Sequence, residues 1–362
     1  LILGLTACGQ KGTGETDTDT PTSSGQAVSE STVSNTLAED EEGLISTYAD
    51  KFSQETYSDS ETGLEITYNY YLPEDYDESK SYPMVVFIAD SSCTGDDATR
   101  SLTQGRGALV WATKEWQAAN PTIVAVPTYP ETILDDHGSY TQTDYVDMTK
   151  SYIDYMTETY AVDKDRIYGT GQSMGCMTTL ILASQYPNLY AACMFVDGQW
   201  DVSTLKGLED QTFVYFAAED DTNAWNGAQE VMAMFDEDDT SYKRAQWDGN
   251  WSVDELSAGA TELFDQEDNQ YFISWATGTI DASNSSMGAG GPGGTGGTSD
   301  GEKPSGDFGG PSNGEKPSGG FGGPASGGAA SGDMNSSAYH MASFDYAYNC
   351  VAVMEWLFLQ KK

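Results

Sequence analysis

The sequence predicts an α/β fold with one mostly parallel central sheet, covered by helices on both faces. Three observations carry this prediction. Short, continuously apolar runs, typical of strands buried on both faces, alternate with segments of helical spacing. Ser173 follows one such strand at a sharp turn into a helix. Acidic residues follow the carboxyl ends of other strands, which is where functional groups lie in parallel sheets.

The predicted strands and helices alternate in the way that a parallel sheet requires. The strands are expected at 64–71, 84–88, 123–126, 167–168, 192–196, 213–217, 242–247 and 271–276. The helices are expected at 109–119, 146–160, 174–182, 225–235 and 344–358. The first strand alternates apolar and polar side chains, so we expect it to be half exposed. Glycines at 169–171 are expected to break the strand before the helix that begins at Met174.

Composition divides the chain into one folded domain and two segments without a core. Residues 9–43 are rich in Thr, Ser, Gly, Asp and Glu and predict a disordered tether. Residues 281–335 hold 19 of the 39 glycines and a tandem repeat that begins GEKPSG, which predicts a disordered insert. The folded domain is then expected at 44–280 and 336–362, a length that suits one α/β domain.

The charge balance argues against nucleic acid as a partner. The chain has 16 basic and 57 acidic residues, a net charge of -41. Such a surface repels phosphate backbones and anionic lipid headgroups. We interpret the negative charge as a property that keeps the protein soluble.

The first eight residues, LILGLTAC, are typical of the end of a truncated signal segment. Their last four resemble the lipobox of bacterial lipoproteins, in which the cysteine is lipidated. The resemblance implies that Cys8 anchors the protein to the outer face of the bacterial cytoplasmic membrane, and that this anchor is its only membrane contact. Cys8 as an ordinary thiol is the alternative.

The other cysteines show no disulfide spacing and lie mostly in apolar runs, so we expect buried thiols. They are Cys93, Cys176, Cys193 and Cys350.

Ser173 lies in the pattern Gly-Gln-Ser-Met-Gly at 171–175, which predicts an exposed nucleophile on a strand-to-helix turn. The pattern also occurs at 297–301 and 310–314, but there no strand precedes it and no helix follows. The alternative role for Ser173 is an inert helix N-cap.

A serine nucleophile needs a base, and the chain has only two histidines. His137 lies in a polar loop before the nucleophile, and we interpret it as a solvated residue. His340 lies after the last strand and before the closing helix, where a loop would bring it to the carboxyl edge of the sheet. His340 is therefore the predicted base.

The acid that orients the base is expected at the end of the strand at 213–217. Asp221 is the first choice, Asp220 the second and Glu219 the third, because sequence alone does not decide which side chain reaches the imidazole. The order serine, acid, histidine is the chain order of α/β-hydrolases.

Backbone N–H groups are expected to form the oxyanion hole. Met174 begins the helix after the nucleophile and supplies one donor, aided by the helix dipole. The second donor is expected from Asp90 or Ser91, in the loop that follows the strand at 84–88.

Four segments resemble one branch of the α/β-hydrolase superfamily: YNYYLPEDYDESKSYPMVVFIAD, DKDRIYGTGQSMG, YFAAEDD, and HMASFDYAY followed by WLF. This branch includes polyhydroxybutyrate depolymerases, feruloyl and acetyl-xylan esterases, and prolyl-oligopeptidase-like peptidases. The resemblance implies a serine hydrolase that needs no cofactor. It would cleave a small-molecule or polysaccharide-linked ester through an acyl-enzyme. Two departures stand out, because the chain has Ala89-Asp90 and Ala217-Ala218 where family members commonly carry His-Gly.

Two other functions stay open at this point. One is a peptidase that uses the same three residues, and the other is a non-catalytic surface protein on a hydrolase scaffold.

Trp200 and Trp225 follow strand ends and are candidates for cleft walls or for core packing. The acidic clusters at 236–239 and 265–269 lack the spacing of a calcium loop, so we expect no metal.

Overall fold

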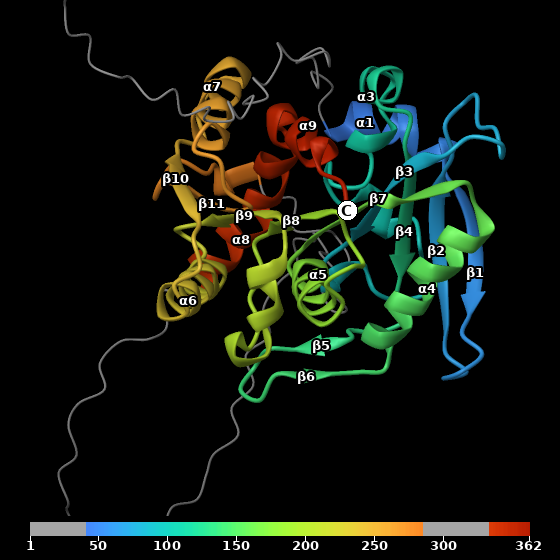
Figure 1. Ribbon diagram of the computed structural model, residues 1–362, viewed down its shortest axis with the longest axis horizontal. Helices are drawn as coiled ribbons and strands as arrows, with labels where there is room; N and C mark the ends of the chain where they lie inside the picture. The colour runs from blue at the N-terminus through green and yellow to red at the C-terminus, as the bar shows by residue number, and fades with distance from the viewer. Residues whose placement is uncertain (1–40, 285–332) are drawn as a thin grey trace, which may run out of the picture.

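The structure is a computed structural model that describes residues 41–284 and 333–362 (Figure 1). Within them, nine strands form one sheet in the order β1-β2-β4-β3-β7-β8-β9-β11-β10. The strands are β1 Ser53–Ser58, β2 Glu65–Tyr71, β3 Tyr82–Ile88, β4 Ile123–Thr128, β7 Val162–Gln172, β8 Ala192–Val196, β9 Phe213–Ala218, β10 Lys243–Trp247 and β11 Gln270–Trp275. Only β1 and β2 pair antiparallel to their neighbours. The predicted mostly parallel sheet is confirmed.

Helices cover both faces of this sheet (Figure 1). One face packs against α1 Glu41–Tyr48, α3 Lys114–Ala119, α7 Val253–Phe264, α8 Asp333–Tyr348 and α9 Val351–Leu359. The other face packs against α4 Tyr145–Thr159, α5 Met174–Gln185 and α6 Thr222–Glu237. A short helix, α2 Arg100–Thr103, follows β3.

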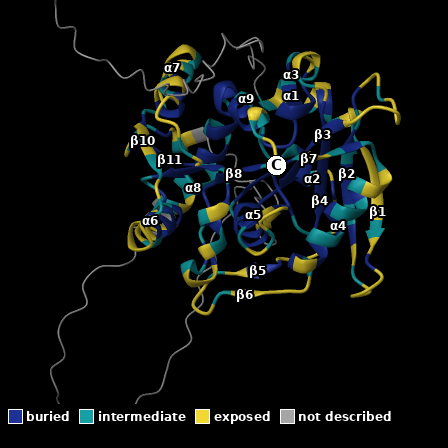
Figure 2. Cartoon of the chain, viewed as in Figure 1, coloured by how far each residue is buried: buried dark blue, intermediate teal, exposed yellow. Residues whose placement is uncertain are grey.

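The central strands are buried on both faces, as Figure 2 shows by their dark colour. In β3, Val85 and Phe87 join the core on one side, whereas Met84, Val86 and Ile88 join the core on the other. Successive side chains of a strand point to opposite faces. The continuously apolar runs of the sequence therefore reflect two cores divided by one sheet.

The glycines at 169–171 do not break the strand, because β7 continues to Gln172. A Cβ at Gly169 would lie 2.9 Å from side-chain atoms of Thr179 and Tyr190, and one at Gly171 would lie 2.6 Å from the Gly175 backbone. These glycines therefore let other parts of the chain approach the strand closely. The prediction of a break was wrong.

Several elements differ from their predicted form. The helix expected at 109–119 is a 3₁₀ turn, Val110–Ala112, followed by α3. The closing helix is two helices, α8 and α9, with a break at Asn349 and Cys350.

Four features were not predicted from the sequence: α1, β1, α7 and a hairpin of two short strands, β5 Leu134–Asp135 and β6 Thr141–Gln142. Helix α7 begins with a capping box between Ser252 and Glu255, a signal that was readable in the sequence.

Both segments expected to be disordered contain structure at their ends. Helix α1 begins at Glu41, a 3₁₀ turn covers Ala282–Asn284, and α8 begins at Asp333. The remaining parts, 1–40 and 285–332, lie outside the described residues, as do Cys8 and the other two matches to the serine pattern. Within the described ranges, none of the helices combines the length and apolarity needed to cross a membrane.

The four cysteines of the described part are buried and free, as predicted. Burial raises the pKa of each of these thiols, to about 12 for Cys93 and for Cys350. Such thiols stay protonated at neutral pH and are poor nucleophiles.

Candidate active site

Ser173 occupies the turn that joins β7 to α5. Its backbone has φ 52° and ψ -117°, a conformation that is unfavourable for a residue with a side chain. Helix α5 starts at the next residue and passes close to the end of β3, because a Cβ at Gly175 would lie only 1.9 Å from the carbonyl oxygen of Ile88. The serine is therefore held in a strained turn beneath a cavity that it lines.

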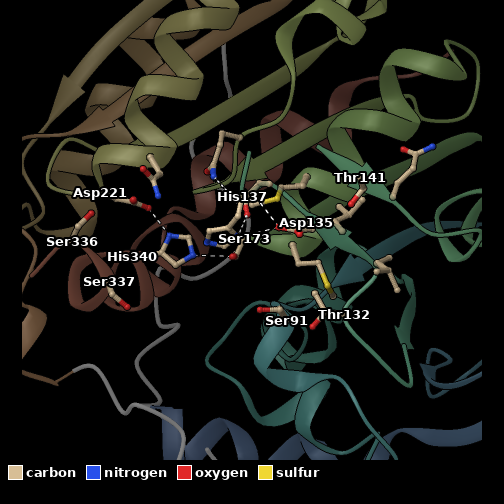
Figure 3. A pocket seen from close by; sticks show the side chains of 18 of the residues that line it. Ser91, Thr132, Asp135, His137, Thr141, Ser173, Asp221, Ser336, Ser337 and His340 are labelled. Atoms are coloured by element: carbon tan, nitrogen blue, oxygen red, sulfur yellow. Dashed lines mark hydrogen bonds and ion pairs between the residues drawn. The ribbon is translucent and has the colours of Figure 1, made fainter. Parts of the chain in front are cut away.

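The structure brings His340 and Asp221 to this serine (Figure 3). His340 Nε2 lies 2.8 Å from Ser173 Oγ, and His340 Nδ1 lies 2.5 Å from Asp221 Oδ2. The prediction that His340 lies on a loop was wrong, because it lies within α8. A helix fixes the imidazole more firmly than a loop does, since its backbone groups are hydrogen-bonded along the helix.

Within the described part of the chain, Asp221 is the only one of the three candidate acids that contacts His340. Its other carboxylate oxygen, Oδ1, accepts the N–H of Ala224 and caps α6, which fixes the side chain. Asp220 instead accepts the Gly278 N–H at 2.6 Å. Glu219 accepts hydrogen bonds from side chains of neighbouring strands and from the segment after β11: Gln246, Ser274 and Thr277.

The surroundings of His340 favour its protonated form. Burial by itself lowers the pKa of this imidazole, but the hydrogen bond and charge of Asp221 act in the opposite direction. The charges of Asp197 and Asp90 add to the effect of Asp221, so the pKa of His340 is raised above its ordinary value. The site is thus arranged to hold a positive charge on the imidazole.

The loop after β3, which was predicted to supply the second oxyanion donor from Asp90 or Ser91, differs from that prediction at Asp90. The Asp90 N–H donates to Gln104 Oε1 at 3.3 Å, so it is not free for a substrate, and the prediction of Asp90 as a donor was wrong. The Asp90 carboxylate accepts the Ser92 N–H at 2.7 Å and caps a 3₁₀ turn, Ser91–Cys93. Ser91 and Met174 both line the cavity, and neither backbone N–H has an acceptor within the described residues.

Two glutamines hold the loop after β3 against the turn at Ser173. Gln172, which directly precedes the serine, donates its amide to Gln104 Oε1 at 2.8 Å. Gln104 in turn donates to Ser92 Oγ at 2.8 Å. One side chain therefore contacts both the loop and the residue before the nucleophile. Gln104 was not predicted from the sequence, since an isolated glutamine in a loop carries no recognisable signal.

The cavity above Ser173 has a volume of about 880 Å³. Its wall away from His340 includes residues of the β5–β6 hairpin and of the loop between its strands. His137, expected to be a solvated loop residue, is exposed and hydrogen-bonded to Asp135, yet it lines this same cavity. The prediction placed His137 correctly in solvent but missed its position beside the site.

Most other lining groups are hydroxyls and amides, and no lysine or arginine of the described residues lines the cavity. Trp200 is buried against Tyr140, and Trp225 lines a separate hollow at β10. Neither tryptophan forms a wall of the cavity.

One cluster in the described part has the composition of a metal site. The ligand atoms of Asp135, Asp136 and His137 all lie within 4.8 Å of one another. The imidazole of His137 is hydrogen-bonded to Asp135 and lies 3.2 Å from Asp136, and the Asp136 carboxylate also accepts a hydrogen bond from Gln199. These contacts account for the cluster without an ion.

Comparisons with known proteins place the chain in a family. Residues 60–269 match the Esterase family. Among solved structures, a thermostable esterase is 20% identical with a TM-score of 0.57 over 87% of this chain, which spans 64% of that protein. No curated protein matches the chain.

Two further structures are similar at lower scores. A feruloyl esterase module from Clostridium thermocellum, complexed with sinapinate, is 14% identical with a TM-score of 0.44 over 62% of this chain and 80% of its own. An S-formylglutathione hydrolase from Staphylococcus aureus is 11% identical with a TM-score of 0.41 over 62% of this chain and 91% of its own. The family match covers more than half of the 362 residues, so this chain belongs to the Esterase family, within the α/β-hydrolase superfamily.

Proposed function

We propose that this protein is a serine hydrolase that cleaves carboxylic esters through a catalytic triad of Ser173, His340 and Asp221. One observation carries the proposal: a strained serine at a cavity lies 2.8 Å from an imidazole whose other nitrogen lies 2.5 Å from a buried carboxylate. This arrangement is the one that activates a hydroxyl for attack on a carbonyl. Family membership supports an ester as the substrate.

The reaction proceeds in two halves. In the first, Ser173 Oγ attacks the ester carbonyl carbon while its proton passes to His340 Nε2. Asp221 accepts the Nδ1–H and stabilises the imidazolium. The backbone N–H groups of Met174 and Ser91 donate to the oxyanion. The ester C–O bond then breaks, and His340 returns the proton to the departing alkoxide, which leaves an acyl-enzyme.

The second half releases the acid. A water molecule loses a proton to His340 and attacks the acyl carbon. The bond between that carbon and Ser173 Oγ breaks, and the serine regains its proton from His340. The products are one carboxylic acid and one alcohol.

The cavity favours a neutral or cationic polar substrate over an anionic one. Its hydroxyl and amide groups suit the hydrogen-bonding groups of a small polar ester or of a sugar-linked ester. Asp135 and Asp136 lie at the hairpin wall and disfavour a negatively charged substrate.

The first test is covalent labelling of the full chain with a fluorophosphonate, followed by location of the adduct by mass spectrometry. We expect one adduct per chain, on Ser173, and none in Ser173→Ala or His340→Ala. His137→Ala is the matched control, because it removes the other histidine of the same cavity and should leave labelling intact. A folded wild-type protein that takes no adduct would contradict the proposal.

The second test separates esters from amides. Wild-type protein is assayed with p-nitrophenyl acetate and with aminoacyl p-nitroanilides. Hydrolysis of the ester, with little hydrolysis of the amides, is expected. Cleavage of the amides alone would replace the esterase by a peptidase that uses the same triad.

A further inference from the structure

Asp197 is a second buried acid beside the proposed triad, and the reaction described above does not use it. It directly follows β8 and is fully buried. Its backbone has a positive φ of 42°, which is uncommon for a residue with a side chain. A strained, buried carboxylate is costly unless its surroundings satisfy it.

The two carboxylate oxygens of Asp197 contact the two elements that supply the triad. Oδ1 accepts the Ala218 N–H at 2.7 Å, and Ala218 ends β9 just before the loop of Asp221. Oδ2 lies 2.6 Å from Ser343 Oγ, which also lies 2.9 Å from the carbonyl oxygen of His340 on the same helix, α8. One side chain thus connects the end of β9 to α8 at the residue that bears the imidazole.

Among the described residues, the charges that act on Asp197 come from members of the proposed triad. The neighbouring groups from α5, β9 and α8 are Cys176, Tyr215 and Tyr348, and the triad adds Asp221 and His340. Burial raises the pKa of the thiol and of both phenols, so these three groups are neutral. Within the described part of the chain, Asp221 and His340 are therefore the charged groups with which Asp197 interacts.

We propose that Asp197 is a positioning residue of the triad: its carboxylate aligns α8 with the end of β9, and its charge favours the imidazolium of His340. The inference rests on the proposed function. During acylation His340 changes from neutral to positive, so a fixed negative charge behind it stabilises the transition state more than the ground state. Asp221 orients the ring through a direct hydrogen bond, whereas Asp197 acts through Ser343 and through its charge.

The pH dependence follows from the same contacts. Burial, and then repulsion from Asp221, raise the pKa of Asp197 to about 7. When the pH falls and Asp197 takes up a proton, its charge is lost and the pKa of His340 falls with it. Because the two groups titrate together, the fall of kcat/KM at low pH extends over a wider pH range than a single ionisation would give. Asp221 and Asp90 are the other carboxylates whose charges act on His340.

Asp197→Asn is the decisive variant because it removes the charge and keeps the hydrogen bonds. The Asn oxygen can accept the Ala218 N–H, and its amide can donate to Ser343 Oγ, which then donates to the His340 carbonyl. We expect kcat for p-nitrophenyl acetate to fall by about tenfold at its plateau, with KM nearly unchanged. We expect the acid midpoint of the kcat/KM profile to move down by about half to one pH unit, as loss of a nearby charge requires. The fall of kcat/KM at low pH should also become as steep as that of a single ionising group.

Ser343→Ala is the second variant and gives a smaller effect in the same direction. The serine hydrogen bond lowers the pKa of Asp197, so without it Asp197 keeps its proton to a higher pH. The acid midpoint should therefore move down by less than in Asp197→Asn. This variant tests the inference even if Asp197→Asn does not fold.

A purely structural role for Asp197 predicts a different result. Both variants would then melt at a lower temperature while the midpoint and steepness of the profile stayed at their wild-type values, and that outcome would overturn the inference. Failure of the proposed function is distinguishable from this, because wild-type protein would then take no fluorophosphonate on Ser173.

Discussion

His340 Nε2 lies 2.8 Å from Ser173 Oγ, although the two residues are 167 positions apart in the chain. The C-terminal helices are tied to the strand that leads to the serine. Tyr348 OH lies 3.0 Å from Thr170 Oγ1, and Tyr168 OH donates to the carbonyl oxygen of Gln360 at 2.9 Å. The geometry between Ser173 and His340 therefore depends on the docking of α8 and α9 against β7.

The fall of kcat/KM at low pH tests whether the pKa of His340 is raised. The pKa of His340 is raised, and the imidazole accepts the serine proton only when it is neutral. Activity should therefore be lost as the pH falls through a midpoint above about 6.5, the ordinary pKa of histidine. The measurement is kcat/KM for p-nitrophenyl acetate against pH. A midpoint at or below that value would contradict the environment described for His340, and His137→Ala should leave the midpoint unchanged.

Exchanging the two neighbouring acids tests which of them serves the imidazole. Asp221→Asn replaces the carboxylate that holds His340 Nδ1, and we expect kcat to fall by about 10³- to 10⁴-fold. Asp220→Asn keeps an oxygen for the Gly278 N–H and should retain kcat within about twofold. Circular dichroism would show that both variants are folded. Equal losses in the two variants would refute the assignment of Asp221.

Gly175→Ala tests the close approach of α5 to β3. The new Cβ would lie 1.9 Å from the carbonyl oxygen of Ile88, so backbone must move. We expect the free energy of unfolding to fall by about 3 kcal/mol or more, measured by urea denaturation, and labelling of Ser173 to be lost.

Gly278→Ala is the control for this substitution. Gly278 has φ +77° with open space around its Cβ position, so alanine there costs about 1 kcal/mol of backbone strain alone. Similar losses in Gly175→Ala and Gly278→Ala would mean that contact with Ile88 does not limit the turn.

Gln104→Ala tests the support of the loop after β3, which we propose carries an oxyanion donor. It removes the acceptor of the Asp90 N–H and leaves the buried amide of Gln172 without its partner. We expect the free energy of unfolding to fall by about 1–3 kcal/mol. We expect kcat to fall by about tenfold with little change in KM, because a displaced oxyanion donor acts mainly in the transition state. Gln142→Ala, at an exposed residue that lines the cavity above Ser173, should change the free energy of unfolding by less than about 0.5 kcal/mol.

The sheet was readable from the sequence wherever a strand is buried on both faces. The runs at 84–88, 192–196 and 213–217 agree with β3, β8 and β9, since only apolar side chains fit between two cores. β1 was missed because its residues, SQETYS, are mostly exposed and carry no apolar pattern. The two-residue strands of the β5–β6 hairpin are too short to show any periodicity.

The sequence by itself determined the mostly parallel sheet and the turn at Ser173. It also reduced the candidate bases to two histidines, with His340 favoured by its place in the chain. These properties depend on residues within a few positions of one another, or on simple order along the chain. Local spacing and composition are enough to reveal them.

Only the tertiary structure decided which neighbouring group contacts which. Asp221 rather than Asp220 meets His340 because capping of α6 fixes its carboxylate. The Asp90 N–H is occupied because Gln104 reaches it from another loop, and Asp197 joins α8 to β9 from a third strand. Apart from the local cap of α6, each of these contacts joins residues that packing brings together from separate segments. Their directions depend on how helices and strands pack together, and no local pattern of residues encodes that packing.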